Sequence, residues 1–161
     1  MALGGLLSYL YETQKTDLSY INDLDYYEQG EFMELDVAAR RNLELTETLR
    51  SKEKRGSLLW VLDKTKTPMG SRCLRGFLER PLLSPTAIGK RQRAVAALVE
   101  DTMAREELIL TLTGIGDIER LIGRIVYGTA GGGDMASLRG VIKNLPAVAA
   151  QLSHFSSGRL G

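Results

Sequence analysis

The chain is poor in the residues that hold small proteins together through covalent bonds or metals. It contains one cysteine and one histidine among 161 residues. One cysteine excludes an internal disulfide framework and favours a reducing compartment, and these two soft ligands are too few for an ordinary zinc site. No apolar run approaches the roughly 18 residues needed to span a bilayer, and no basic segment precedes the apolar N-terminus. We therefore expect a cytoplasmic protein without a membrane segment.

The sequence also lacks the motifs of common catalytic sites. No window supplies the Gly-x-x-x-x-Gly-Lys-Ser/Thr pattern of a phosphate-binding loop. Residues 128–133 are rich in glycine but no lysine follows them, so we interpret them as a connector between two helices. His154 has no nucleophile or carboxylate arranged around it. We predict no catalytic, cofactor-binding or metal-binding residue, and we do not expect the chain to be an enzyme.

The remaining composition is typical of a helical globular domain. Hydrophobic residues make up 43% of the chain and charged residues 25%, whereas aromatic residues make up only 6%. The first two values are ordinary for a folded domain, and the low aromatic content favours helices over a β-sandwich. We predict a mainly α fold, a multi-helical bundle of about one domain in length.

Helix start signals and apolar spacing locate the helices along the chain. Proline at the first helical position gives up only an N–H that has no helical partner, so Pro68 and Pro85 mark two helix starts. The residues placed to cap helix N-termini are Asp36, Ser57 and Asp117, and Thr67 and Ser84 directly precede the two prolines that mark helix starts. The predicted helices cover residues 2–14, 37–42, 58–62, 68–80, 85–99, 102–113, 117–127 and 134–155, with a kink or restart at Pro146.

The apolar stripes of these helices predict the side chains that face a core. Cys73 falls on such a stripe and is interpreted as a small buried hydrophobe rather than a reactive thiol. We also expect Trp60, Phe77, Val95 and Val99 to be buried.

A different pattern occurs near residue 30. Residues 18–27 lose the helical period, and Gly30 separates them from Phe32–Leu35. This arrangement predicts two short strands, a small β-hairpin near the N-terminus. Leu43–Leu45 alternates as a further short strand would.

The charges are unevenly distributed, although the net charge is only +1. Residues 1–50 carry four basic and ten acidic side chains, whereas residues 64–93 carry eight basic side chains and Glu79 alone as an acid. This basic segment is a candidate DNA-facing patch, with Arg72, Arg75, Lys90 and Arg93 as its candidate contacts. Two alternatives stay open: an ordinary solvated helix face, or a surface that meets the acidic half of the same chain.

Four stretches, in order, resemble one known family. The first is Leu6–Leu10 with Glu12–Lys15, and the second is Met33–Asp36 with Arg40–Leu45. The third is Ser57–Leu59 with Leu62-Asp63, Thr65, Thr67, Met69-Gly70, Arg72, Leu74 and Pro81-Leu82. The fourth is Ile88, Arg91, Ala94-Val95 and Leu98 with Asp117–Leu121 and Gly123-Arg124. Together they resemble the start of the large helical core, or lever, domain (domain III) of the MutS family of DNA mismatch-repair proteins. Ala39 and Phe77 depart from the family pattern, which usually has threonine and tryptophan there.

The resemblance implies a domain organisation and a role. Residues 1–15 would be the helix leading in from the connector domain, and residues 16–161 a partial core domain without the mismatch-reading, clamp and ATPase domains. In the intact protein this core links binding of mismatched DNA by the clamp to ATP binding and hydrolysis. The implied cofactors, ATP and Mg, and the implied partners, mismatched duplex DNA, a second MutS subunit and MutL, belong to that intact protein. Alone, the chain is expected to be monomeric or weakly self-associating.

Within such a coupling domain, a few residues would hold fixed joints between helices. The candidates are Asp36, Arg41, Asn42, Glu44, Thr67, Gly70 and Arg72. For Asn42 a simpler alternative is a buried turn asparagine that satisfies backbone groups. For the chain as a whole, the alternative is an autonomous module that binds duplex DNA non-specifically through residues 64–93.

Overall fold

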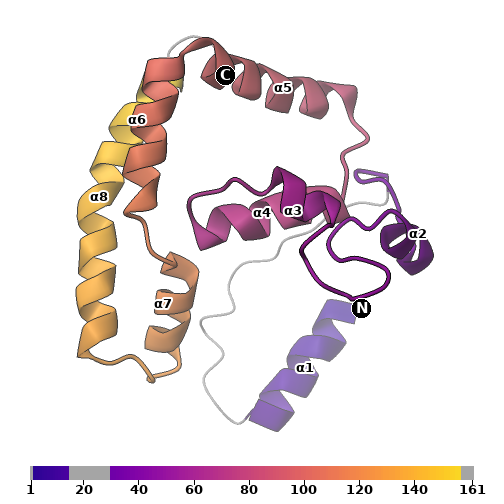
Figure 1. Ribbon diagram of the computed structural model, residues 1–161. Coiled ribbons are helices and arrows are strands. Elements are labelled where there is room, and N and C mark those ends of the chain that lie inside the picture. The colour runs from indigo at the N-terminus through magenta and orange to yellow at the C-terminus, as the bar shows by residue number, and fades with distance from the viewer. Residues whose placement is uncertain (1, 15–29, 157–161) are drawn as a thin grey trace.

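The computed structural model describes residues 2–14 and 30–156, which form helices joined by turns and loops (Figure 1). The helices are α1 (Ala2–Gln14), α2 (Val37–Asn42), α3 (Leu58–Leu62), α4 (Pro68–Glu79), α5 (Pro85–Glu100), α6 (Thr102–Thr113), α7 (Ile118–Val126) and α8 (Gly132–Ser156). This part of the chain contains no sheet, so the predicted mainly helical class is confirmed. None of its helices is both long enough and apolar enough to cross a membrane.

The predicted helix caps are in place, and the residues before the two prolines also act as caps. The side-chain oxygens of Asp36, Ser57, Thr67, Ser84 and Asp117 each accept a hydrogen bond from the backbone N–H three residues later. Each bond satisfies a donor that the first helical turn leaves without a helical partner. Asp101 caps α6 in the same way, through the Ala104 N–H at 3.0 Å, and was not among the predicted caps.

The predicted β-hairpin near the N-terminus is not supported. Its first strand, residues 18–27, lies outside the described residues, and its second pairs elsewhere. Phe32 forms an isolated antiparallel bridge with Leu82, and the Met33 N–H donates to the Pro81 carbonyl at 2.7 Å. Residues 31–33 therefore bond to the linker after α4, a partner too distant in the sequence for local spacing to reveal.

The stretch Leu43–Leu45 is a turn, so the predicted short strand there is wrong. Glu44 has a φ of 47°, in the left-handed region that non-glycine residues rarely adopt. The Leu58 and Leu59 N–H groups donate to the carbonyls of Glu44 and Leu45 at 3.0 and 2.9 Å. These bonds tie the turn to the start of α3, a tertiary contact that overrides the alternating pattern.

Helix α8 continues through Pro146 and does not restart there. Proline removes one backbone donor from a helix and disfavours its continuation. Here α6 packs along α8, the most extensive helix pair in the chain. This packing supports one continuous helix where sequence alone predicted a kink or restart.

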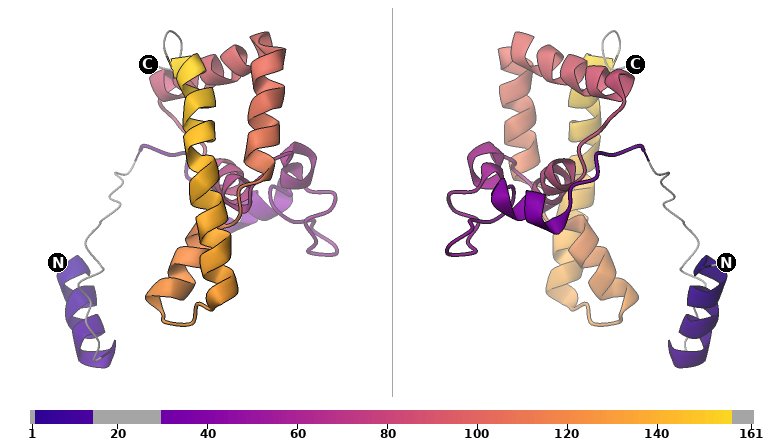
Figure 2. Two further views of the ribbon diagram at one scale, coloured as in Figure 1. Left: turned by 90° about the vertical axis from the view of Figure 1, so that its left-hand side faces the viewer. Right: turned by 90° about the vertical axis from the view of Figure 1, so that its right-hand side faces the viewer.

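The helices fall into two segments. The N-terminal segment (residues 30–83) contains α2, α3 and α4, with α3 packed on α4, and the C-terminal segment (residues 84–156) contains α5 to α8. In the C-terminal segment α5 meets α6, α6 runs beside α8, and α7 packs on α8. Helix α1 lies apart from both segments (Figures 1 and 2).

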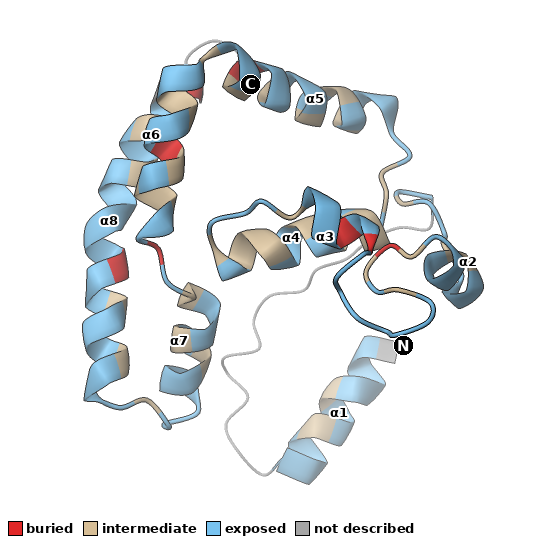
Figure 3. Cartoon of the chain, in the orientation of Figure 1, coloured by how far each residue is buried: buried red, intermediate tan, exposed pale blue. Residues whose placement is uncertain are grey.

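The described core is thin (Figure 3). The accessible surface of the chain is 12236 Å², against about 7,900 Å² for a compact protein of this mass. The buried apolar residues are Leu45, Leu59, Ala97, Leu108, Ile115, Val141 and Phe155. The predicted core positions Trp60, Phe77, Cys73, Val95 and Val99 are exposed instead. Their helix stripes are apolar, but no second helix covers those faces in this part of the chain.

Candidate functional site

Asp63, directly after α3, joins three parts of the N-terminal segment. Lys54 from the preceding loop forms an ion pair with Asp63 Oδ2, and Ser71 Oγ of α4 donates to the same oxygen at 2.6 Å. Thr65 Oγ1 donates to Asp63 Oδ1 at 2.6 Å. Only 9% of the Asp63 side chain is exposed. The hydrogen bond from Lys54, followed by those from Ser71 and Thr65, holds the pKa of Asp63 well below its usual range.

Asp63 was not predicted as a joint residue, although it lies in the stretches that carry the family resemblance. The spacing of Asp63 and Thr65 in the sequence was a local signal for one of these hydrogen bonds. An aspartate commonly accepts a hydrogen bond from the backbone N–H two residues later, and the Thr65 N–H donates to Asp63 Oδ1 at 3.3 Å. The bonds from Lys54 and Ser71 depend on tertiary placement and had no local signal.

The predicted joint residues around α2 divide into two pairs. Asp36 caps α2, and Glu44 Oε1 accepts the Leu49 N–H at 2.6 Å, which closes the loop after the turn. Arg41 and Asn42 are exposed, and their side chains have no hydrogen-bond or ion-pair partner within the described residues. Asn42 is therefore not a buried turn asparagine. The contacts support a joint at Asp36 and Glu44, and the roles of Arg41 and Asn42 stay predictions.

Thr67 and Gly70 fit closely at the start of α4. Thr67 Oγ1 accepts the Gly70 N–H at 3.0 Å. A Cβ atom added at Gly70 would lie 3.0 Å from Thr67 Oγ1 and 3.3 Å from Thr65 Cβ. Both separations are shorter than an ordinary van der Waals contact of about 3.5 Å. The small size of glycine therefore lets the cap and the preceding loop close on α4.

Arg72 connects the two segments. Its Nη1 and Nη2 donate to the two carboxylate oxygens of Asp117 at 2.9 and 2.8 Å, and Nη2 also donates to Glu119 Oε2 at 2.6 Å. We call these three side chains the Arg72 fork. Its bidentate geometry matches a planar guanidinium to a carboxylate. The hydrogen bonds from Arg72, with that from the Arg120 N–H, lower the pKa of Asp117 to about 2.

The basic segment does not present all its charges to solvent. Besides the Arg72 fork, Arg75 Nε pairs with Glu79 Oε1 at 2.9 Å within α4, and the Arg91 guanidinium carbon lies 3.6 Å from the centre of the Phe77 ring. Lys90 and Arg93 are exposed on α5. Helices α4 and α5 run in opposite directions (Figure 1). The four candidate DNA contacts therefore come from two helices, and acidic side chains already engage two of them.

A second ionic corner lies where α7 turns into α8. Arg124 Nη1 pairs with Asp134 Oδ1 at 2.9 Å, and Asp134 Oδ2 accepts the Gly131 N–H at 2.8 Å. Arg124 Nη2 also donates to the Thr129 carbonyl at 3.4 Å. These bonds fix the glycine-rich residues 128–133 as a structured connector.

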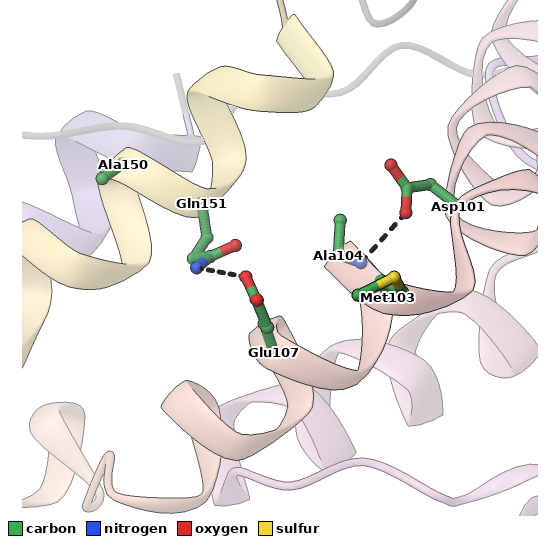
Figure 4. Close-up of a pocket in the computed structure, with 6 residues that line it drawn as sticks. All are labelled: Asp101, Met103, Ala104, Glu107, Ala150 and Gln151. Atoms are coloured by element: carbon green, nitrogen blue, oxygen red, sulfur yellow. Dashed lines mark hydrogen bonds between the residues drawn. The ribbon is translucent and has the colours of Figure 1, made fainter.

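An open pocket of about 460 Å³ lies between the start of α6 and the later part of α8. Figure 4 shows Glu107 of α6 reaching Gln151 of α8, whose Nε2 donates to Glu107 Oε2 at 3.0 Å. Asp101, on the same wall, is used as the cap of α6. The polar groups of this pocket therefore serve helix contacts.

The described residues contain no group of three or more metal-ligating side chains, and no phosphate-binding loop occurs in the sequence. The chemistry of the site is one of hydrogen bonds and ion pairs that hold helix ends together.

Fold and site together define a mainly helical domain whose described helix ends are joined by polar contacts. Comparison with known proteins gives its family: residues 38–160 match the family described as MutS domain III. The DNA mismatch repair protein MutS of Desulforamulus reducens is 48% identical over 99% of this chain, and that of Clostridium novyi is 46% identical over 97%. The Bacillus cytotoxicus protein of the same name is 43% identical over 94%. The chain belongs to the MutS family, and it spans under a fifth of the length of these relatives.

Proposed function

We propose that this chain is a structural and coupling segment of a DNA mismatch-repair protein. In that role it carries movement between the part that binds mismatched DNA and the part that binds and hydrolyses ATP. The observation that carries the proposal is the Arg72 fork, because it joins two helical segments through side chains rather than through a shared apolar core. Coupling requires stiff elements linked at a few defined places.

The proposal includes the remaining organisation that the family resemblance implies. Helix α1 leads in from a connector domain, and the rest of the chain is part of the core domain. ATP and Mg are cofactors of the intact protein, and its partners are mismatched duplex DNA, a second MutS subunit and MutL, in the cytoplasm. The chain itself carries out no catalysis.

A chimera tests coupling directly. The matching segment of the Desulforamulus reducens protein is replaced by this sequence, and ATP hydrolysis is measured with and without a mismatched duplex. We expect stimulation by the mismatch in the chimera and its loss in the chimera with Arg72→Gln. Arg75→Gln is the matched control, because Arg75 pairs only within α4 among the described ion pairs. Equal stimulation in the Arg72→Gln and Arg75→Gln chimeras would contradict a coupling role for the fork.

A second candidate function is non-specific binding of duplex DNA through residues 64–93. The exposed Lys90 and Arg93 on α5 favour it. The combined variant Arg72→Gln, Arg75→Gln, Lys90→Gln and Arg93→Gln separates the two functions. A scaffold keeps its weak affinity for a labelled duplex, whereas a DNA-binding module loses affinity and shows a shallower dependence on salt.

A further inference from the structure

The chain from α4 to the start of α7 follows a closed path, which we call the frame, and side-chain bonds between α4 and α7 complete it. Helix α4 runs in one direction, the linker 80–84 leads into α5, and α5 runs back above α4 before α6 turns down towards the start of α7 (Figure 1). Extensive helix packing is confined to each segment: α3 with α4 in one, and α5, α6, α7 and α8 in the other. The start of α7 then meets α4 at the Arg72 fork, which bonds residues 45 positions apart.

The opposite corner of the frame has the features of a hinge. The linker is fixed to the N-terminal segment, because the Met33 N–H donates to the Pro81 carbonyl and the Leu83 N–H to the Glu31 carbonyl. Pro85 then begins α5 and fixes its own φ angle. Ser84 is fixed to α5, because its side chain and carbonyl accept the Ala87 and Ile88 N–H groups and the residue before a proline is restricted. Rotation is therefore concentrated where the linker meets this cap, at the Leu83–Ser84 junction. Arg91 of α5 also stacks on Phe77 of α4, with its guanidinium carbon 3.6 Å from the ring centre.

The closing contact is of a kind that opens easily. The Arg72 side chain is 48% exposed and that of Glu119 is 69% exposed, whereas that of Asp117 is 21% exposed. Exposed ion pairs contribute little net free energy and are screened by salt. The short, bidentate bonds to Asp117 nevertheless favour one closed geometry over others. A reversible latch requires a contact that contributes little net free energy but has a defined geometry.

We propose that the Arg72 fork is a salt-sensitive latch, and that releasing it lets the C-terminal segment rotate about the Leu83–Ser84 junction as one body. This property belongs to the isolated chain and goes beyond the proposed repair function. The two proposals fail separately: mismatch stimulation in the chimera without a substitution tests the repair function, whereas the latch is tested by distances within the chain alone.

Distances between paired spin labels test the latch in the full chain without DNA or nucleotide. In a Cys73→Ala background, Val61→Cys on α3 and Tyr127→Cys after α7 place one label in each segment, at positions 54% and 80% exposed. We expect one narrow distance distribution at low salt that broadens towards about 1 M salt, where the screening length falls to about 3 Å. Arg72→Gln should raise the ratio of open to closed molecules by about two- to five-fold at low salt.

Two controls keep the result decisive. Arg75→Gln removes the same charge from the same helix and should leave the distribution narrow, because its partner Glu79 lies within α4. Circular dichroism verifies that each variant is folded. The latch is overturned if folded Arg72→Gln and the native chain give the same distribution, or if the native distribution does not change up to 1 M salt.

Discussion

Different forces stabilise the N-terminal and the C-terminal segment internally. In the N-terminal segment, short helices and loops are tied by polar bonds that converge on Asp63 and on the caps, with Ser57 fully buried beside Leu59. In the C-terminal segment, longer helices pack on one another through apolar contacts. The buried residues there are Ala97, Leu108, Ile115, Val141 and Phe155.

This difference indicates how each segment can move. Apolar packing is non-directional, and in this segment it buries residues of α5, α6 and α8 and of the loop before α7. Polar bonds require defined distances and angles, so the N-terminal segment holds a fixed geometry with little buried apolar area. We infer that the C-terminal segment moves as one body, whereas the N-terminal segment provides the fixed positions against which it moves.

The largest effect should come from the apolar segment. Leu108 of α6 is 8% exposed and Leu110 on the same helix is 74% exposed. Leu108→Ala should lower the free energy of unfolding by about 2–4 kcal/mol, through lost burial and the cavity left behind. Leu110→Ala is the matched control and should change it by less than about 0.5 kcal/mol. Denaturant unfolding followed by circular dichroism measures both, and equal effects would contradict the assignment of the core.

A smaller effect is expected at the polar node. Asp63→Asn removes the charge that Lys54 and Ser71 bind and should cost about 2 kcal/mol, since hydrogen bonds to charged groups exceed neutral ones. Glu47→Gln, an exposed carboxylate in the same segment, serves as control. If both substitutions leave the unfolding midpoint unchanged, polar bonds do not hold this segment.

Two glycines of α4 provide a sharper comparison on one helix. Gly70→Ala should destabilise by about 1 kcal/mol, because the new methyl group presses on Thr67 and Thr65. Gly76, with nothing within 4 Å of an added Cβ, should instead gain about 0.5–1 kcal/mol as Gly76→Ala through better helix propensity. Thermal unfolding should give shifts of opposite sign, and shifts of the same sign would contradict the close fit at Gly70.

The smallest predicted effect is a change in folding stability with pH, which occurs only in acid. The pKa of Asp117 is about 2 in the folded chain and that of Asp63 is also lowered, whereas a free aspartate titrates near about 3.9. The unfolded chain then binds more protons in this range, so the stability these groups contribute is present above about pH 4 and is lost as pH falls towards about 2.

The double variant Asp63→Asn, Asp117→Asn checks this assignment. Asparagine still caps α7, but neither side chain titrates. We expect a shallower loss of stability between about pH 4 and pH 2.5 than in the native chain. An unchanged slope would place the acid sensitivity in other carboxylates.

Helix positions could be predicted from the sequence because their signals are local. A cap at Thr67 or Asp117 is completed by an N–H three residues away, and Pro68 fixes the next position. The joint at Arg72 was predicted from its stretch, but not its partners. Asp117 and Glu119 lie far along the chain, and only the folded frame brings them to α4.

Burial was the least predictable feature. Cys73 and Val95 lie on apolar stripes, yet both are exposed, because a stripe identifies a face and not the element that covers it. The hairpin prediction has the same origin: residues 31–33 have strand character, but their bridge partner follows α4. Pairing partners and covering layers are tertiary properties, and one sequence without its fold does not specify them.

The most direct test of the central claim is fluorescence anisotropy of a labelled duplex titrated with this chain. A matched duplex and a duplex with one mismatch are compared at low and physiological salt. A coupling scaffold predicts equal, weak binding to both duplexes that disappears at physiological salt, since non-specific contacts to phosphate release counterions. Salt-resistant binding that favours the mismatch would contradict the account, because this segment would then read DNA itself.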